Sequence, residues 1–260
     1  DNTALCTITS LDNTVGAVVQ ANGATGSPGA TIPQNNQIDG DDAAGIPGVS
    51  QVLIADNTCG QTGSGDNLAM CLIGFTDNSI APIVQTNSVS DADDQTVISQ
   101  DNGLVISQVL DLENDCDENT FRGSADNNAE CTQFSSLDNI LGAVSQLNAA
   151  DGEDNSISNQ DNTVAISQNL LAENDCNGTG GNNVICNNSA DGLFNLIFVD
   201  IVQTNDATLF GDVSSDQIND LSVGQSGALV NTCDETGGGI NQATCENTSV
   251  ANLIGPISQS

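Results

Sequence analysis

One stretch of sequence recurs along this chain at a nearly constant interval, and this repetition limits the folds that the chain can adopt. Its clearest copies are DNGLVISQVLDLENDC, from Asp101 to Cys116, and DNTVAISQNLLAENDC, from Asp161 to Cys176. The cysteines give the period, which is about 58 residues. One series is Cys59, Cys116, Cys176 and Cys233, and the other is Cys6, Cys71, Cys131, Cys186 and Cys245. We therefore predict a single elongated repeat domain over residues 1–260, with repeats 6–70, 71–130, 131–185 and 186–244 and a partial repeat 245–260.

Within each repeat the apolar residues alternate as they do in strands. Val164, Ile166 and Gln168 fall on one side of an extended chain, and Ala165 and Ser167 fall on the other. Short runs of β-branched residues bounded by Asn, Asp and Gly are typical of strands joined by turns. We predict an all-β fold, a β-solenoid-like stack of about four disulfide-stapled repeats. The alternative is a β-sandwich-type filament subunit that associates by strand donation.

Glutamine recurs at matching points of the repeats. In a stack, equivalent side chains lie one above another, so their amides can hydrogen-bond along the axis as a ladder. The other interpretation is that these glutamines are ordinary surface residues of an acidic chain without lysine. The predicted ladder residues are Gln20, Gln51, Gln85, Gln108, Gln146, Gln168, Gln203, Gln225 and Gln259.

The spacing of asparagine and glutamine resembles that of a known family. Asn102 and Gln108 are six residues apart, as are Asn162 and Gln168, and this resembles the curlin repeats of bacterial amyloid-like fibres and, more loosely, other β-solenoid extracellular fibre proteins. The resemblance covers fragments of each repeat, and the longer period and the cysteines depart from the curlin pattern. It implies a secreted, fibre-forming β-structure and no particular partner.

The charge of the chain excludes several functions. There are 35 acidic residues against a single basic one, for a net charge of −34. Such a chain cannot displace counterions from nucleic acid, and it is repelled by anionic membranes. Close packing of copies is opposed by the same charge, so assembly should depend on salt, bound cations or covalent links. No apolar run is long enough to span a membrane. The sequence begins at Asp1, which we interpret as a mature, secreted, extracellular chain whose leader was removed.

Nine cysteines without histidine argue against a zinc site and favour disulfides in an oxidising compartment. In loop pairing, each bond joins the two cysteines on either side of a glycine-rich segment. It would give Cys59–Cys71, Cys116–Cys131, Cys176–Cys186 and Cys233–Cys245 and leave Cys6 for a bond between subunits. Body pairing would give Cys6–Cys59, Cys71–Cys116, Cys131–Cys176 and Cys186–Cys233 and leave Cys245. We favour loop pairing because each bond would close a short, glycine-rich segment, which stabilises the fold by about 3 kcal/mol. Spacing alone does not decide between the two.

The two ends of the sequence carry equivalent segments. Residues 6–20 and 245–259 are copies of the same half-repeat, and the second copy is as apolar as the internal ones. An uncapped strand is a template for another chain, so we expect head-to-tail association by stacking or by donation of a terminal strand. The alternative is that 245–260 is the closing strand of a monomer.

Ligand and modification sites are suggested by acidic loops and by glycosylation acceptors. The predicted calcium ligands are Asp91, Asp93, Asp94, Asp151, Glu153 and Asp154, and the alternative is that they are solvated surface turns. The N-x-S/T acceptors are Asn177, Asn187 and Asn247. Without histidine or lysine the usual bases are missing, so we predict no catalytic residue and no enzyme.

These patterns together predict a structural protein. The predicted function is a secreted subunit of an extracellular filament, fibre or biofilm matrix, whose partner is itself. The alternative is a monomeric cell-surface adhesin or a calcium-binding stalk module. Apart from the calcium candidate, no cofactor is predicted.

Overall fold

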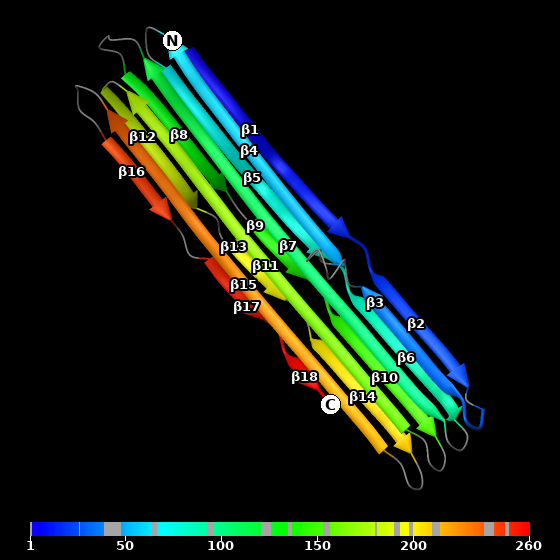
Figure 1. Cartoon of the computed structure of the whole chain (residues 1–260). Coiled ribbons are helices and arrows are strands. Elements are labelled where there is room, and N and C mark those ends of the chain that lie inside the picture. The colour runs from blue at the N-terminus through cyan, green and yellow to red at the C-terminus, as the bar shows by residue number, and fades with distance from the viewer. Residues whose placement is uncertain are drawn as a thin grey trace.

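The computed structural model describes residues 2–25, 27–38, 48–63, 67–92, 96–120, 126–134, 137–152, 157–179, 181–189, 193–197, 200–209, 214–236, 242–247 and 250–260. Over these residues the chain is all-β, as predicted, and its strands pair in parallel in three open sheets. Figure 1 shows the strands running side by side along an elongated body. The described ranges contain no helix that is long and apolar enough to cross a membrane.

Two of the sheets form the first layer. The larger sheet contains β1 (Asn2–Val15), β5 (Asn67–Ile80), β8 (Asp126–Phe134), β9 (Leu137–Leu141), β12 (Gly181–Ser189), β13 (Leu193–Ile197), β16 (Gln242–Asn247) and β17 (Val250–Ile254). The smaller contains β2 (Val18–Thr25), β6 (Ile83–Ala92), β10 (Val144–Gly152), β14 (Ile201–Leu209) and β18 (Ile257–Gln259). Backbone bonds such as Ala81 N–H to Val15 O, at 2.9 Å, link the rows at the break between the two sheets.

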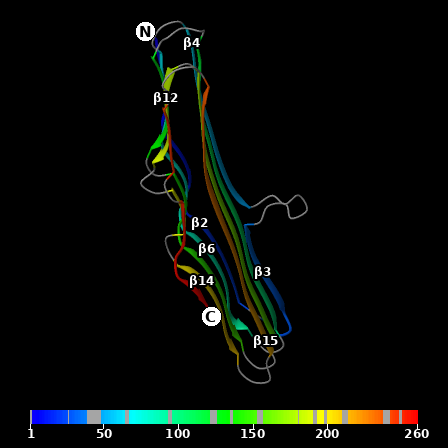
Figure 2. The same ribbon diagram turned by 90° about the vertical axis from the view of Figure 1, so that its left-hand side faces the viewer.

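The third sheet forms the second layer, which faces the first (Figure 2). It contains β3 (Thr31–Ile38), β4 (Val49–Gly63), β7 (Val97–Thr120), β11 (Ile157–Thr179) and β15 (Ser214–Thr236). Here β7 is a single strand of 24 residues, and β11 and β15 have 23 each. These three strands of the second layer are therefore about four times longer than the usual five or six residues.

Paired strands meet in the register of the sequence period. Cys71 is opposite Cys6, Gln146 is opposite Gln85, and Cys176 is opposite Cys116. The consecutive strands of one repeat thus form one rung, and equivalent strands of successive rungs pair with each other. The rungs are β1 to β4, β5 to β7, β8 to β11, β12 to β15, and β16 to β18. We call β1 to β4 the first edge and β15 to β18 the last edge, because each of these strands pairs with a neighbour on one side only.

The interior between the layers is filled by alternate residues of each strand. Along β7 every even-numbered residue from Ile98 to Cys116 is buried, and the alternation predicted from the sequence is confirmed. These inward residues are Ile98, Gln100, Asn102, Leu104, Ile106, Gln108, Leu110, Leu112, Asn114 and Cys116. Aliphatic clusters therefore alternate with amide side chains, and a cysteine cluster lies at one end of the rung.

Two glycines occupy positions that no other residue fits well. Gly29 has a φ of 71° in the turn that joins β2 to β3, where Ala30 N–H donates to Ser27 O at 3.0 Å. At Gly74 in β5, a Cβ atom would lie 2.5 Å from the carbonyl oxygen of Thr9 in β1. Gly74 therefore permits the close approach of the first two rungs.

Candidate functional site

Three glutamine columns run through the rungs. The column in the first layer is Gln20, Gln85, Gln146, Gln203 and Gln259, and those in the second layer are Gln51, Gln108, Gln168 and Gln225, and Gln34, Gln100, Gln160 and Gln217. In every case the side-chain Nε2 donates to Oε1 of the preceding rung, over 2.6 to 2.9 Å. The first two columns contain the glutamines singled out in the sequence, and the third was not included there.

The glutamines also connect the two layers. Nε2 of Gln85, in the first layer, donates to the carbonyl oxygens of Asn36 at 2.8 Å and Gly103 at 3.0 Å in the second. Gln108 makes the reverse connection, because its Nε2 donates to the carbonyl oxygens of Asn78 and Ile140, both at 3.0 Å. Both glutamine side chains are fully buried, and burying an amide is tolerated because it is hydrogen-bonded.

Asparagine columns accompany the glutamines, and their hydrogen bonds point the other way. Nδ2 of each asparagine donates to Oδ1 of the following rung, over 2.8 to 3.2 Å. The links run along Asn22, Asn87, Asn148 and Asn205; Asn36, Asn102, Asn162 and Asn219; Asn78, Asn139, Asn195 and Asn252; Asn57 and Asn114; and Asn174 and Asn231.

Stacking predicts ladders of asparagine as well as of glutamine, but the individual asparagine positions were not singled out in the sequence. The two-residue alternation along a strand could have identified them. Asn102 and Asn162 lie two residues after an inward glutamine, so their side chains are on the same side of the strand. In a stack, any inward polar residue that recurs with the period must be paired along the axis or across the layers.

The two sets of columns give the edges different chemistry. At the first edge, Nε2 of Gln20, Gln34 and Gln51 has no preceding glutamine and donates to backbone carbonyl oxygens instead. At the last edge, the columns end in the Oε1 atoms of Gln217, Gln225 and Gln259 and in the Nδ2 atoms of Asn219 and Asn252. The first edge therefore presents glutamine donors, and the last edge presents glutamine acceptors.

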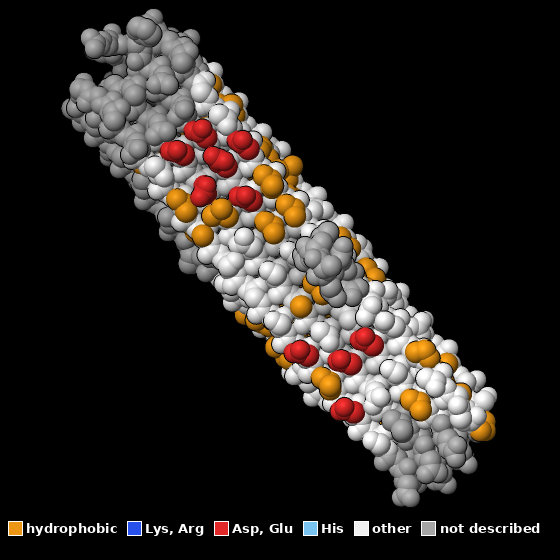
Figure 3. All heavy atoms as spheres, viewed as in Figure 1, with side chains coloured by type: hydrophobic (Ala, Val, Ile, Leu, Met, Phe, Trp, Pro, Cys, Tyr) orange, Lys and Arg blue, Asp and Glu red, His pale blue; other side chains and the backbone are white. Residues whose placement is uncertain are grey.

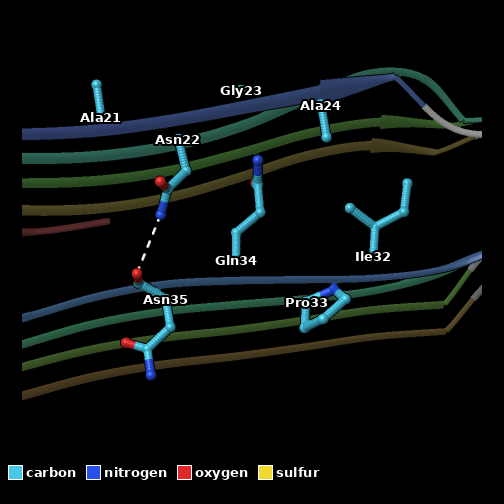
Figure 4. Close-up of a pocket in the computed structure, with 8 residues that line it drawn as sticks. All are labelled: Ala21, Asn22, Gly23, Ala24, Ile32, Pro33, Gln34 and Asn35. Atoms are coloured by element: carbon cyan, nitrogen blue, oxygen red, sulfur yellow. Dashed lines mark hydrogen bonds between the residues drawn. The ribbon is translucent and has the colours of Figure 1, made fainter.

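The interior is open at the first edge. Figure 4 shows Asn22 and Ala24 of β2 and Ile32 and Gln34 of β3 pointing into the space between the layers, where they line a cavity of about 490 Å³. Asn22 Nδ2 donates across it to the carbonyl oxygen of Asn35 at 3.0 Å. This cavity is the end of the polar interior that the inner rungs cover.

Exposed apolar side chains gather at the two edges. Every large hydrophobic residue that is exposed within the described ranges lies on an edge strand. They are Leu5, Val19, Val52 and Ile54 at the first edge, and Ile218, Val230, Leu253, Ile254 and Ile257 at the last. Val19 is 68 % exposed, whereas Val84, its partner one rung further in, is half-buried. The missing neighbour on one side accounts for this difference.

The disulfides correct the favoured pairing. Cys6 is bonded to Cys59, and Cys71 to Cys116, so loop pairing is wrong for these four residues. The bonded cysteines lie within strands that face each other across the interior, and their Cα atoms are 5.8 and 6.1 Å apart, within disulfide reach. Because Cys6 is bonded within the chain, it is not held as a free link to another subunit.

The remaining cysteines are described in part. Cys176 and Cys233 are also disulfide-bonded, and Cys131 Sγ lies 3.5 Å from the carbonyl oxygen of Asp175. The side chains of Cys186 and Cys245 lie outside the described residues. Disulfides of this kind fit an extracellular protein.

Most of the predicted calcium and glycosylation residues cannot be placed. Asp93, Asp94, Glu153 and Asp154 lie outside the described residues, as does the side chain of Asp91, and Asp151 is exposed at the end of β10. The acceptors Asn177, Asn187 and Asn247 lie in strands, but their side chains are outside the described part of the chain. Within that part, three side chains that could hold a metal ion, those of Cys71, Cys116 and Cys131, lie within 4.8 Å of one another.

Carboxylates collect on the outside of the layers. Figure 3 shows Asp and Glu side chains in two groups on one face. Asp56, Glu113 and Glu173 are register partners on successive rungs of the second layer, so like charges stand next to each other. On the first layer, Asp12, Asp77 and Asp138 form a similar row.

Asp77 is a described carboxyl whose pKa is shifted by its surroundings. Burial raises the pKa of Asp77 above its ordinary value of 3.8, and the negative charge of Asp12 raises it further. A hydrogen bond with the backbone of Asp138 acts in the opposite direction and is the weakest of the three effects. The ionised carboxylate of Asp77 therefore opposes folding.

The chain was compared with known families, proteins and structures. No family model, curated protein or solved structure matches it.

Proposed function

We propose that this protein is a structural subunit of an extracellular filament, in which copies stack head to tail and the rungs of each continue those of the next as a β-solenoid. The observation that carries the proposal is the polarity of the amide columns. The first edge presents glutamine Nε2 donors and the last edge presents glutamine Oε1 acceptors.

This polarity favours contact between unlike edges. If two last edges met, Oε1 of Gln259 would face Oε1 of Gln259 in the other copy, and the two acceptors would not bond. If a first edge meets a last edge, Nε2 of Gln20 faces Oε1 of Gln259, and the column continues without a break. The asparagines obey the same rule in the opposite direction. A contact between unlike surfaces that does not close into a ring generates a filament.

The proposed contact runs through the first layer. There, β17 and β18 of one copy would lie beside β1 and β2 of the next, continuing the spacing and register of the rungs. The contact would cover Val19, Leu253 and Ile257, which are at least half exposed, and burial of apolar surface contributes about 25 cal/mol per Å². The second layer has one row of strands fewer, so β15 would keep an open edge at this contact.

Charge should control when assembly occurs. A chain with a net charge of −34 repels its copies. Exposed charges more than about 8 Å apart are largely screened from each other at physiological ionic strength, and added salt shortens this distance. Added salt should therefore favour filaments. Specificity would come from the amides buried at the contact, whose hydrogen bonds are little affected by salt.

A proline at Val19 tests the contact. Val18 N–H donates to Pro82 O at 3.2 Å, and successive N–H groups of a parallel strand point to opposite sides, so Val19 N–H points to the open side. Val19→Pro should remove that donor and block the neighbouring copy with little effect on the pairing of β2 with β6. Electron microscopy of the purified protein in salt should show filaments for the parent and dispersed rods for Val19→Pro.

Val19→Thr is the matched control, because it keeps the N–H group and a β-branched side chain and should still form filaments. Circular dichroism checks that both variants keep the parent's β-structure. Filaments of parental length from Val19→Pro would rule out the β2 edge as the contact. Dispersed particles from the parent in all salts, with or without calcium, would contradict the filament itself.

A further inference from the structure

The cysteines form one continuous row through the molecule. Strand register places Cys6, Cys71, Cys131, Cys186 and Cys245 side by side in the first layer, and Cys59, Cys116, Cys176 and Cys233 side by side in the second. The described side chains from both series pack into one cluster. Each second-layer cysteine thus lies between two first-layer cysteines of successive rungs.

The sulfur atoms show that two partners are within reach. Sγ atoms of Cys71, Cys116 and Cys131 all lie within 4.8 Å of one another, and all three residues are buried. Cys116 is bonded to Cys71, but Cys131 is a second neighbour for it. One rung earlier, Cys59 and Cys71 are the register partners of Cys116 and Cys131, and Cys71 Sγ lies 4.0 Å from the carbonyl oxygen of Cys59. The row therefore brings together both the body pairs and the loop pairs.

Because the number of cysteines is odd, this arrangement allows more than one disulfide pairing. Nine cysteines cannot all form disulfides with one another, so one sulfur in the row stays unpaired in any complete intrachain pairing. Moving that sulfur along the row exchanges body pairs for loop pairs, one rung at a time. In full body pairing the unpaired position is Cys245, and in full loop pairing it is Cys6.

We propose that this row is a disulfide relay, in which thiol–disulfide exchange shifts the pairing between two registers and carries the odd thiol from one edge toward the other. In the step that reaches the first edge, the thiolate of Cys71, released when Cys131 takes over its partner Cys116, attacks Sγ of Cys59. The Cys59–Cys71 bond forms, the Cys6–Cys59 bond breaks, and Cys6 leaves as a thiolate that takes up the proton released by Cys71. One disulfide replaces another, so the step needs no oxidant.

The relay would decide where the protein can react with other molecules. Body pairing keeps Cys6 in a bond with Cys59, whereas loop pairing would place a thiol at Cys6, on β1 of the first edge. The exchange itself lies inside one chain and does not depend on filament formation. Its failure would leave the proposed contact between copies untouched.

Removal of Cys6 tests the relay. In Cys6→Ser, Cys59 loses its partner and becomes the attacking thiol. After equilibration in a glutathione buffer that maintains disulfides, thiols are capped with N-ethylmaleimide, and the protein is unfolded and cut with an aspartate-specific protease. Mass spectrometry should find a Cys59–Cys71 peptide and a loss of the Cys71–Cys116 peptide.

Thr7→Ser is the control, because it alters the exposed neighbour of Cys6 and should retain Cys71–Cys116. The relay is overturned if Cys6→Ser keeps Cys71–Cys116 and carries the cap on Cys59. Should Cys6→Ser fail to fold, the parent chain gives the answer across a series of glutathione ratios. Both Cys71–Cys116 and Cys59–Cys71 peptides are then expected, and one register at every ratio contradicts the proposal.

Discussion

The inner and edge rungs carry the same sequence pattern in different surroundings. Gln108 of β7 is fully buried, whereas Gln225, two rungs further along the same column on β15, is only half-buried. Leu110 and Leu53, which are register partners, differ in the same way. The pattern therefore fixes the position of each side chain, but the neighbouring rungs on both sides supply its burial and most of its stabilising energy.

The largest difference is expected for the aliphatic core. Leu110→Ala leaves a cavity that is enclosed on all sides and should lower the free energy of unfolding by about 3 kcal/mol. Leu53→Ala removes the same atoms at the first edge, where the site is partly open, and should cost about half as much. Urea unfolding followed by circular dichroism measures both, and equal losses would show that edge and inner rungs are packed alike.

A smaller difference is expected for the amide column. In Gln108→Leu, Oε1 of Gln51 and the carbonyl oxygens of Asn78 and Ile140 lose the donor Nε2 of Gln108. Nε2 of Gln168 loses one of its acceptors. Unsatisfied buried groups of this kind should cost about 2 to 3 kcal/mol in total. Gln225→Leu at the last edge should cost about 1 kcal/mol, because water can reach the groups it leaves. The same unfolding measurement applies, and a greater loss for Gln225→Leu would contradict the ladder account.

The smallest effect concerns Asp77 and depends on pH. Because burial raises the pKa of Asp77 in the folded chain above its ordinary value of 3.8, the folded chain binds the proton more tightly than the unfolded chain does. Its contribution is favourable below pH 3.8 and is lost as the pH rises through the raised pKa. Asp77→Asn should therefore raise the unfolding midpoint at pH 7 and leave it unchanged at pH 3.

Asp12→Asn, at the first edge, provides the comparison for Asp77. It removes the second cause of the raised pKa of Asp77 and leaves the first, which is burial. Its gain at pH 7 should be smaller than that of Asp77→Asn. A gain for either variant that persists at pH 3 would show that the effect is not due to the charge of Asp77.

Some features of this fold could be predicted from particular residues. The periodic cysteines and the alternation around Val164 and Gln168 are enough to predict parallel strands with a constant register, since side chains two apart share one face. The same alternation places glutamine on the buried side. Both features follow from the spacing of residues along the sequence and do not require knowing which distant residues are in contact.

The disulfide pairing could not be derived in this way. Cys71 is 12 residues from Cys59 and 45 from Cys116, and the shorter loop favoured the wrong partner. Because the row sets both cysteines beside Cys71, sequence distance does not choose between them. That the acidic loops bind a cation stays a prediction, since Asp and Glu are frequent in the turns of this sequence whether or not they bind one.

The central claim, that the rungs continue from copy to copy, is tested most directly by electron cryomicroscopy of the parent protein assembled in salt. The predicted result is a polar filament with strands spaced about 4.8 Å along its axis. At each boundary, Gln20 of one copy should lie beside Gln259 of the next. Copies related by a two-fold axis, with like edges in contact, would contradict the claim.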